Sequence, residues 1–453
     1  MCLSWQGDSF LLFWVAAFIS SWGSVYWLKT NEETRGKVFL GLSLLPLYFF
    51  MTPDDDVYRY LSEGHMLLKG LNPYEISPNV ANINLVNRDL VNHSEWTAIY
   101  GPIYLYLFMF IAWVGGGVYV MKIVWLSLHL LNVVLFRKTI NKDVAMMYCF
   151  SPFILFETIG QGHLEQLLVT GVLLLILGVK SSSAKYISLG ILIGCWVKWW
   201  LLPALPLVIR KPNLKALSMF LVGSIILLFP FVDPSFSILD SLLDFRELWS
   251  CGYPYLWTCE ILGDHWGRIS IVIFLLLIGG SVLLLGGNLS EQIWQLFRWS
   301  LFFAPTLHPW YFVFPLSAAL CSNKKTTFLV IGVLAMGLHH PEFYVRAGEG
   351  WVSNWFYSLP LFLALFFSEW RLRHHFFLQN GETVERFTVV TPVLNEEDNL
   401  REIGRQINLM SESIQDWIVV DAGSTDDSVE VAKGLGAKVF SPGVKGRGEQ
   451  IHF

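Results

Sequence analysis

Long apolar runs separated by short polar stretches fill the first 370 residues of the chain. Runs of this kind approach the roughly 20 residues that a helix needs to cross the ~30 Å hydrocarbon layer of a membrane. About thirteen segments fit this pattern, and two or three are short enough to be tilted or re-entrant. They are 9–28, 38–51, 99–117, 122–136, 144–158, 163–179, 186–208, 216–232, 268–287, 293–306, 311–321, 326–340 and 353–369. The pattern predicts a polytopic α-helical membrane bundle of about 11–13 spans over residues 1–370.

Polarity changes after Trp370, where the pattern becomes typical of a soluble α/β segment. Residues 371–386 are predicted to be a juxtamembrane linker. The β-branched runs 387-FTVVTPV-393 and 417-WIVVD-421 flank a stretch, 396–414, with apolar residues at helical spacing. A second helix is predicted from Ser424 and a third strand at 437-AKVFS-441, so the order strand–helix–strand–helix–strand predicts a parallel sheet.

Composition supports the membrane assignment and excludes other classes. Hydrophobic residues make up 54% of the 453 residues and charged residues 15%, whereas soluble proteins usually carry about a quarter charged residues. The stretch MCLSWQGDSF lacks a basic region before segment 9–28, which is therefore expected to be retained as a span. The sequence shows no nucleotide-binding P-loop, no zinc-ligand spacing and no basic face for nucleic acid.

Clusters of basic residues orient the bundle, because cytoplasmic loops are rich in Lys and Arg. With thirteen spans, parity places four clusters in the cytoplasm, and the C-terminus with them. They are Lys29, Arg35 and Lys37; Arg210, Lys211 and Lys215; Lys324 and Lys325; and Arg371 and Arg373. The acid-rich loops 52–98 and 233–267 then face outside. The same count puts Gln161–Glu165 inside. It puts the basic residues Arg137, Lys138 and Lys142 outside, which conflicts with the rule that basic residues lie inside. The topology of residues 118–165 therefore stays open.

Three consecutive carboxylates, Asp54, Asp55 and Asp56, follow the second apolar segment in 51-MTPDDDVYRYLSEGH-65. Such a cluster suits a general base for a hydroxyl nucleophile, or a divalent cation such as Mg²⁺ or Mn²⁺ held by Asp54 and Asp56. A solvated acidic face is the alternative, since the repulsion of neighbouring carboxylates in water is only ~1 kcal/mol per pair. The nearby Arg59 and Tyr100 favour the functional reading.

Ionisable residues also interrupt later apolar segments, where such groups usually face a cavity or a partner. His163 and Glu165 stand in 160-GQGHLEQ-166, Lys198 in 197-VKWWLLPALP-206, and His308 in 308-HPWYFVFPL-316. A lysine at position 198 can neutralise a phosphate of a lipid-linked donor. The alternatives are a helix-capping pair for His163 and Glu165, a snorkelling lysine for Lys198, and a helix cap for His308.

This order of motifs resembles the integral-membrane GT-C glycosyltransferases, especially polyprenyl-phosphate-dependent, mannosyltransferase-like members. The motifs are the acidic loop, the later 70-GLNPY-74 and 99-IYGPIYLY-106, and the interrupted segments described above. The resemblance covers most of residues 50–320. It implies transfer of a hexose from a polyprenyl-phosphate donor to a glycan or lipid acceptor on the outer face. It also implies catalytic roles for Asp54, Asp55 and Asp56. The implied substrate-binding residues are Arg59, Tyr100, His163, Glu165, Lys198 and His308.

The C-terminal segment resembles the first half of a family-2 glycosyltransferase, whose GT-A fold binds nucleotide sugars. The resemblance lies in 391-TPVLNEEDNL-400, 418-IVVDAGSTDDSVEVA-432 and 445-KGRGEQ-450, and it implies nucleotide binding by Asn395, Glu396 and Asp421. Ala422 stands where many members have a second Asp. Residues 387–453 stop before the family's metal-binding and catalytic acids, so we expect a truncated half-domain that does not itself catalyse transfer.

Two functions remain in competition. The first is a hexosyltransferase in a bacterial-type inner membrane, serving the cell envelope. The second is a membrane scaffold or transporter of lipid-linked sugars, whose C-terminal half-domain docks or binds a nucleotide-sugar enzyme. Transporters often show internal repeats with broken helices in matching halves, and none is evident in this sequence. The acidic loop favours the enzyme.

Overall fold

The computed structural model describes residues 45–46, 48–84, 88–199, 201–202, 205–206, 214–232, 237–239, 252–285, 288–305, 307–339, 355–367, 387–409 and 414–443. The chain divides into two compact units, Met1–Ser368 and Glu369–Phe453. The predictions for the span 9–28, the linker 371–386 and the segment 445–450 lie outside the described residues. So do those for Lys29, Arg35, Lys37, Arg210, Lys211, Arg371 and Arg373.

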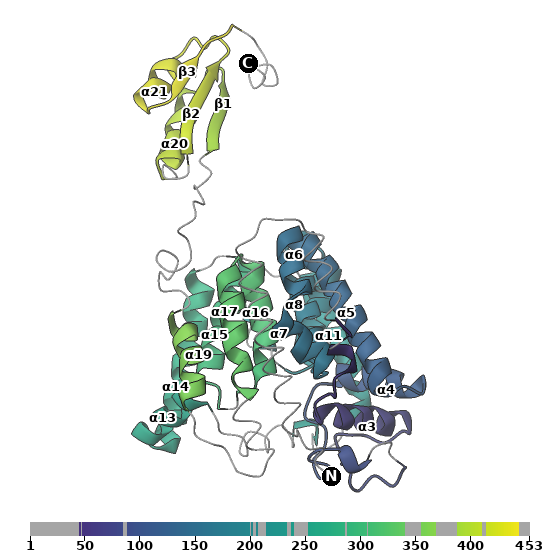
Figure 1. Cartoon of the computed structure of the whole chain (residues 1–453). Helices are drawn as coiled ribbons and strands as arrows, with labels where there is room; N and C mark the ends of the chain where they lie inside the picture. Colours follow the sequence, from purple (N-terminus) through teal and green to yellow (C-terminus); the bar gives the residue numbers. More distant parts are fainter. Residues whose placement is uncertain are drawn as a thin grey trace. The chain divides into compact units, whose positions relative to one another are not determined.

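Helices build the described part of the first unit (Figure 1). Its first half contains α3 Asp56–Leu68, η1 Arg88–Leu90, α4 Pro102–Trp113, α5 Val118–Thr139, α6 Lys142–Cys149, α7 Pro152–Leu155, the π-helix η2 Phe156–Gly160, α8 Glu165–Lys180 and α9 Ala184–Trp196. Its second half contains α11 Leu214–Leu228, η4 Phe229–Phe231, η5 Ser237–Leu239, α13 Tyr253–Leu262, α14 Asp264–Leu285, α15 Leu289–Phe302, η6 Pro309–Phe312, α16 Val313–Cys321, α17 Lys325–Met336 and α19 Trp355–Phe367.

Three described helical segments are long and apolar enough to cross a membrane: Val118–Thr139, Leu214–Phe231 and Asp264–Leu284. A fourth is added if Lys142–Cys149 and Pro152–Gly160, which meet at a bend of 50°, form one broken span. Several other apolar helices, such as α9 and α17, are shorter than 18 residues. The helical, apolar character fits an integral membrane protein, and the full bundle of 11–13 spans stays a prediction.

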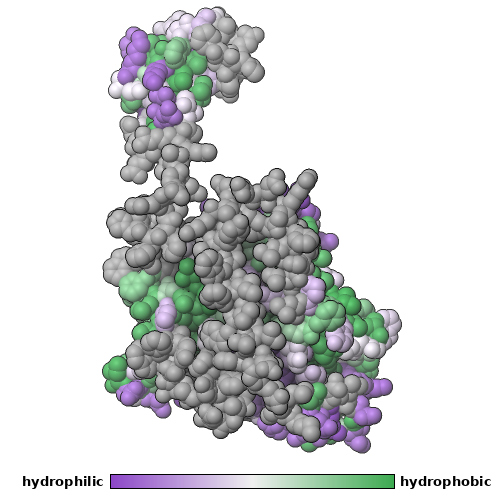
Figure 2. Space-filling model, viewed as in Figure 1, coloured by the Kyte–Doolittle hydropathy of each residue, from purple (hydrophilic) through white to green (hydrophobic). Residues whose placement is uncertain are grey.

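The outer surface of these helices is apolar, as lipid contact requires. Exposed aliphatic side chains include Ile123 and Leu130 on α5, Ile225 on α11, and Leu276 on α14. Figure 2 shows hydrophobic residues on the flank of the helical unit and hydrophilic residues gathered at its lower end, around α3 and the loop that follows it. An apolar band beside a polar end is typical of a protein that sits in a bilayer.

Helix α5 connects two ends of the bundle that differ in charge. Near its start, the Lys122 ammonium donates to the Met51 carbonyl at 2.7 Å, and Met51 directly precedes the acidic cluster. At its end, the Thr139 carbonyl accepts from the Lys180 ammonium at 2.7 Å. A helix of 22 residues is about 33 Å long, so these contacts lie at opposite ends, which we call the acidic end and the basic end.

The position of α4 corrects the sequence-based topology. Segment 99–117 was predicted to be a span, but its helix has 12 residues, or about 18 Å. The Phe108 ring of α4 lies 5.5 Å from that of Tyr60 on α3 and 6.0 Å from that of Trp125 on α5. The chain therefore reaches the start of α5 without crossing.

Arg137, Lys138 and Lys142 consequently lie at the end of α5 away from the acids. The parity count placed them on the same side as the acidic loop, whereas the structure places them at the opposite end of α5, because the count included a span that α4 is too short to form.

Residues 161–165 lie at the acidic end, which corrects the second parity assignment. The Gln161 carbonyl accepts from the Asp54 backbone N–H at 3.0 Å. The bent pair formed by α6, α7 and η2 returns the chain from the basic end to this position. Gln161–Glu165 therefore share a face with the acidic cluster, as the resemblance to GT-C enzymes implies.

The second unit is a small α/β structure with a parallel three-stranded sheet in the order β1-β2-β3. Its elements are β1 Phe387–Val393, α20 Glu397–Leu409, β2 Ile414–Asp421, α21 Ser428–Gly434 and β3 Lys438–Phe440. Its core contains the buried residues Leu400, Trp417 and Val419. The predicted alternation of strands and helices is confirmed, but the second helix begins at Ser428 and not at the predicted Ser424, with Asp427 at its N-cap position. The complete GT-A fold stays a prediction.

Candidate functional site

The acidic cluster lies at the N-terminal end of α3. Asp54 is buried, whereas Asp55 and Asp56 are partly exposed, and one oxygen from each carboxylate lies within 4.8 Å of the others. The Asp56 N–H donates to Asp54 Oδ1 at 3.1 Å. Negative charge is favoured at a helix N-terminus, where backbone N–H groups are unpaired within the helix. The fold therefore holds three carboxylates together.

Asn92 and Tyr60 fix the orientation of this cluster. The Asn92 amide donates to Asp56 Oδ1 at 2.7 Å and to Asp55 Oδ1 at 3.3 Å. The Tyr60 hydroxyl donates to Asp56 Oδ2 at 3.2 Å. Asn92 was not predicted, because one asparagine in a long polar loop gives no signal in the sequence. It bridges two of the three carboxylates and reduces their repulsion by hydrogen bonding.

Arg59 was predicted to contact substrate, and this stays a prediction. In the structure its guanidinium binds Glu63 and the neighbouring loop. Its guanidinium is buried and donates to Glu63 Oε1 at 2.9 Å. It also donates to the carbonyls of His93, Trp96 and Thr97. These bonds tie the loop to α3, so the position of Arg59 supports a positioning role.

Glu63 completes this buried pair. Its second oxygen accepts from the Tyr104 hydroxyl of α4. Burial raises the pKa of the Glu63 carboxyl, against the opposing effect of the Arg59 charge and of these hydrogen bonds. Arg59, Glu63 and Tyr104 together hold α3, α4 and the loop in one arrangement beneath the acids.

Lys198 and Glu165 form a buried ion pair. The Lys198 ammonium lies 2.6 Å from Glu165 Oε1, and the two side chains are 1% and 0% exposed. The same ammonium lies 4.5 Å from the centre of the Tyr100 ring and 5.7 Å from that of Tyr311. Lys198 therefore does not snorkel to water. Glu165 Oε2 has no hydrogen-bond partner among the described residues.

A strained turn after α9 places Lys198. Trp199 has a φ of 59°, a left-handed conformation that is unusual for a bulky residue. Its indole N–H donates to the Ile99 carbonyl at 3.2 Å, and the Gly101 N–H donates to the Val197 carbonyl at 2.9 Å. These bonds hold the loop containing Tyr100 against Lys198, and they offset the strain.

Aromatic rings extend the cluster to the late motif 308-HPWYFVFPL-316. The Trp310 ring is stacked with the imidazoles of His163, at 3.8 Å between centroids, and His308, at 4.4 Å. The His308 ring also lies 5.2 Å from that of Tyr311, next to Lys198. The predicted residues His163 and His308 thus meet through Trp310, which was not singled out in the sequence.

Two further polar residues that were not predicted are Glu157, which is buried, and His339, which is partly exposed. Glu157 Oε1 lies 2.7 Å from His339 Nε2, and Glu157 Oε2 lies 3.9 Å from His163 Nε2. Glu157 belongs to the π-helix η2, an irregularity that is frequent at functional sites. An acid inside the apolar segment 144–158 was the signal in the sequence, but its partner His339 is remote in the chain.

The predicted site residues of the first unit thus gather at the acidic end. The Tyr60 ring lies 5.9 Å from that of Tyr100, which links Asp56 to Lys198 and Glu165. Five segments far apart in sequence contribute to this arrangement, which we call the acidic-end site. It combines carboxylates, an ammonium and aromatic rings.

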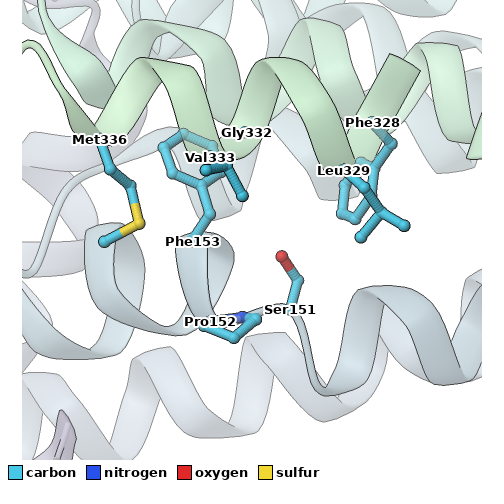
Figure 3. A pocket seen from close by; sticks show the side chains of 8 residues that line it. All are labelled: Ser151, Pro152, Phe153, Phe328, Leu329, Gly332, Val333 and Met336. Atoms are coloured by element: carbon cyan, nitrogen blue, oxygen red, sulfur yellow. The ribbon is translucent and has the colours of Figure 1, made fainter. Parts of the chain in front are cut away.

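A separate apolar pocket lies where α7 packs against α17 (Figure 3). In Figure 3 the Ser151 hydroxyl points into this pocket, and side chains of α17 face it. The lining residues are Ser151, Pro152, Phe153, Phe328, Leu329, Gly332, Val333 and Met336. None of them belongs to the predicted site.

In the second unit, Asn395, Glu396 and Asp421 meet at the carboxyl end of the sheet, as predicted. Val393 and Asp421 are partners in the parallel register. Asp421 accepts from the N–H groups of Gly423 and Ser424, while Asn395 Oδ1 accepts from the Thr425 N–H. The Glu396 N–H donates to Ser428 Oγ at 2.8 Å.

These bonds brace the loops after β1 and β2. Nucleotide binding by Asn395, Glu396 and Asp421 stays a prediction. The hydrogen bonds described above serve to hold the two loops together.

Comparison with known proteins bears on the first unit. Residues 9–211 match the family model described as alpha-(1->6)-mannopyranosyltransferase, N-terminal domain. The matched range contains the acidic cluster, Tyr100, Glu165 and Lys198, and ends before His308. Neither the curated proteins nor the solved structures gave a match to the chain. The N-terminal part of the chain is therefore similar to a mannosyltransferase domain, which supports a membrane glycosyltransferase.

Proposed function

We propose that the acidic-end site transfers a hexose, mannose or a close relative, from a polyprenyl-phosphate donor to a hydroxyl of a glycan or lipid acceptor. The observation that carries the proposal is the meeting of Asp56, Tyr100, Lys198 and Glu165 at one end of an apolar bundle. A lipid-linked sugar phosphate presents an apolar tail to the membrane and an anionic headgroup to its surface. The site offers a cation and carboxylates at that boundary.

Each group has a distinct task in this reaction. A carboxylate of the acidic cluster takes the proton from the acceptor hydroxyl as the new bond to the sugar carbon forms. The bond between that carbon and the phosphate oxygen breaks, and polyprenyl phosphate leaves. The Lys198 ammonium stabilises the leaving phosphate when Glu165 is displaced from it. Tyr100 and Tyr311 border the ammonium and offer apolar faces to the sugar.

A divalent cation fits the donor chemistry of this cluster. Mg²⁺ and Mn²⁺ prefer oxygen ligands, and the oxygens of Asp54, Asp55 and Asp56 lie within 4.8 Å of one another. Asp54 and Asp56 would hold the ion, with Asp55 completing the set. A bound cation would supply positive charge for an anionic headgroup.

The donor class is the most direct test of the proposal. We expect the purified full-length chain in lipid vesicles to transfer mannose from polyprenyl-phosphate-linked mannose, and to leave nucleotide-linked mannose unchanged. The reason is that the ion pair and carboxylates belong to the membrane unit, whereas the predicted nucleotide residues brace loops in the other unit. The assay follows radiolabelled sugar into an acceptor in both reactions. Transfer from the nucleotide donor alone would contradict the proposal.

A further inference from the structure

Lys122 is a fully buried lysine in α5, one of the candidate membrane spans. A charged group inside such a helix is costly, and it is usually retained for a partner or a function. Lysines near the ends of spans commonly extend to water. Lys122 does the opposite, because its side chain is 0% exposed and its ammonium points into the protein.

The ammonium joins two segments of backbone. It donates to the carbonyls of Met51 at 2.7 Å, Tyr48 at 3.2 Å and Gly160 at 3.0 Å. An ammonium has three N–H donors, so these three acceptors account for all of them. Two acceptors precede the acidic cluster, and the third ends η2, directly before the segment that contains His163 and Glu165.

The same two segments touch again immediately beyond this clamp. The Asp54 N–H donates to the Gln161 carbonyl at 3.0 Å. A Cβ on Gly160 would lie 2.7 Å from Met51 Sδ, and one on Gly162 would lie 2.5 Å from Val57 Cγ2. Gly162 also has a φ of +90°, which disfavours any other residue. The two glycines of the motif 160-GQGHLEQ-166 thus permit the close approach that Lys122 holds.

We propose that Lys122 is a positioning residue that sets the acidic cluster against the His163–Glu165 segment. The Lys122 ammonium and the Asp54 N–H both link the two segments. The inference rests on the proposed function for its catalytic consequence. Its structural part, the clamp between residues 48–54 and 160–161, is independent of that function.

The test uses three variants of the full-length chain in vesicles. Lys122→Met removes the N–H donors while keeping a side chain of similar length. Lys122→Arg keeps the positive charge and the donors. Lys138→Met is the control, because it makes the same change at an exposed site of the same helix. The first measurement is hydrogen–deuterium exchange of peptides that cover residues 52–57 and 160–164. The second is kcat and KM for transfer from polyprenyl-phosphate-linked mannose.

We expect Lys122→Met to speed exchange in both peptides by about tenfold or more and to lower kcat by about 10- to 100-fold, since small displacements of reacting groups have effects of that size. KM for the lipid donor should stay within about threefold, because Lys122 does not touch substrate. Lys122→Arg should retain protection and most of kcat, and Lys138→Met should match the wild type.

Unchanged exchange in Lys122→Met would overturn the clamp, whatever the activity. Faster exchange with wild-type kcat would overturn the positioning role. Equal loss in Lys122→Met and Lys122→Arg would also contradict it, because the arginine keeps the donors. Failure of the wild type to transfer from the lipid donor would count against the proposed function, and the exchange result would still decide the clamp.

Discussion

Replacing Asp54, Asp55 and Asp56 together by asparagine is expected to lower transfer from the lipid-linked donor by about 10²–10⁴-fold, the usual contribution of a general base. Asparagine has nearly the same shape and keeps one carbonyl oxygen. The bonds from the Asp56 N–H and from Asn92 can therefore persist. The variant loses the charge that removes a proton or holds a cation.

The fold should tolerate this change. Asp55 and Asp56 are partly exposed, and altered hydrogen bonds cost about 1 kcal/mol each. Expression and membrane insertion should be unaffected. Asp143→Asn, at an exposed position on α6 at the basic end, is the matched control and should retain full activity. Transfer at the wild-type rate by the triple variant would remove the acids from the mechanism.

Breaking the Lys198–Glu165 pair should affect both stability and transfer. Lys198→Met or Glu165→Gln leaves one buried charge without its partner, which typically costs about 3–5 kcal/mol. The double variant Lys198→Met, Glu165→Gln contains neither charge, so we expect it to regain most of the lost thermal stability. Transfer should stay lost, because methionine cannot stabilise a leaving phosphate.

Thermal unfolding and transfer rates of the single and double variants, measured side by side, separate the two roles of the pair. Lys185→Met, at an exposed position on α9, controls for the loss of a positive charge. A double variant that regains both stability and wild-type transfer would show that the pair serves only the fold.

The sequence predicted the members of the acidic-end site better than their partners. Asp54–Asp56, Lys198 and Glu165 could be identified because charge in an apolar context is costly and therefore informative. The partners depend on which segments meet in space. Asn92 and Trp310 are ordinary residues in their own segments, and their roles follow from contacts with residues remote in the chain.

The topology shows the same limit. Hydropathy predicted segment 99–117 as a span, since α4 is strongly apolar, but a helix of 12 residues packed between α3 and α5 does not cross. Similarly, hydropathy gave no sign of the 50° bend that follows α6. Lys122 is the first residue of the predicted span 122–136 and was not singled out in the sequence, because its role follows from three carbonyl partners remote in the chain.

The central claim is that distant segments form one site for a lipid-linked sugar at the acidic end, and photo-crosslinking tests it most directly. The probe is a polyprenyl-phosphate mannose with a photoreactive group on the sugar, bound to the full-length chain in vesicles and mapped by mass spectrometry. We predict crosslinks in peptides that contain Tyr100, Glu165 or Tyr311, and their loss when unlabelled donor competes. Crosslinks confined to the basic end, around Lys142 or Lys180, or to residues 387–443 would contradict the account.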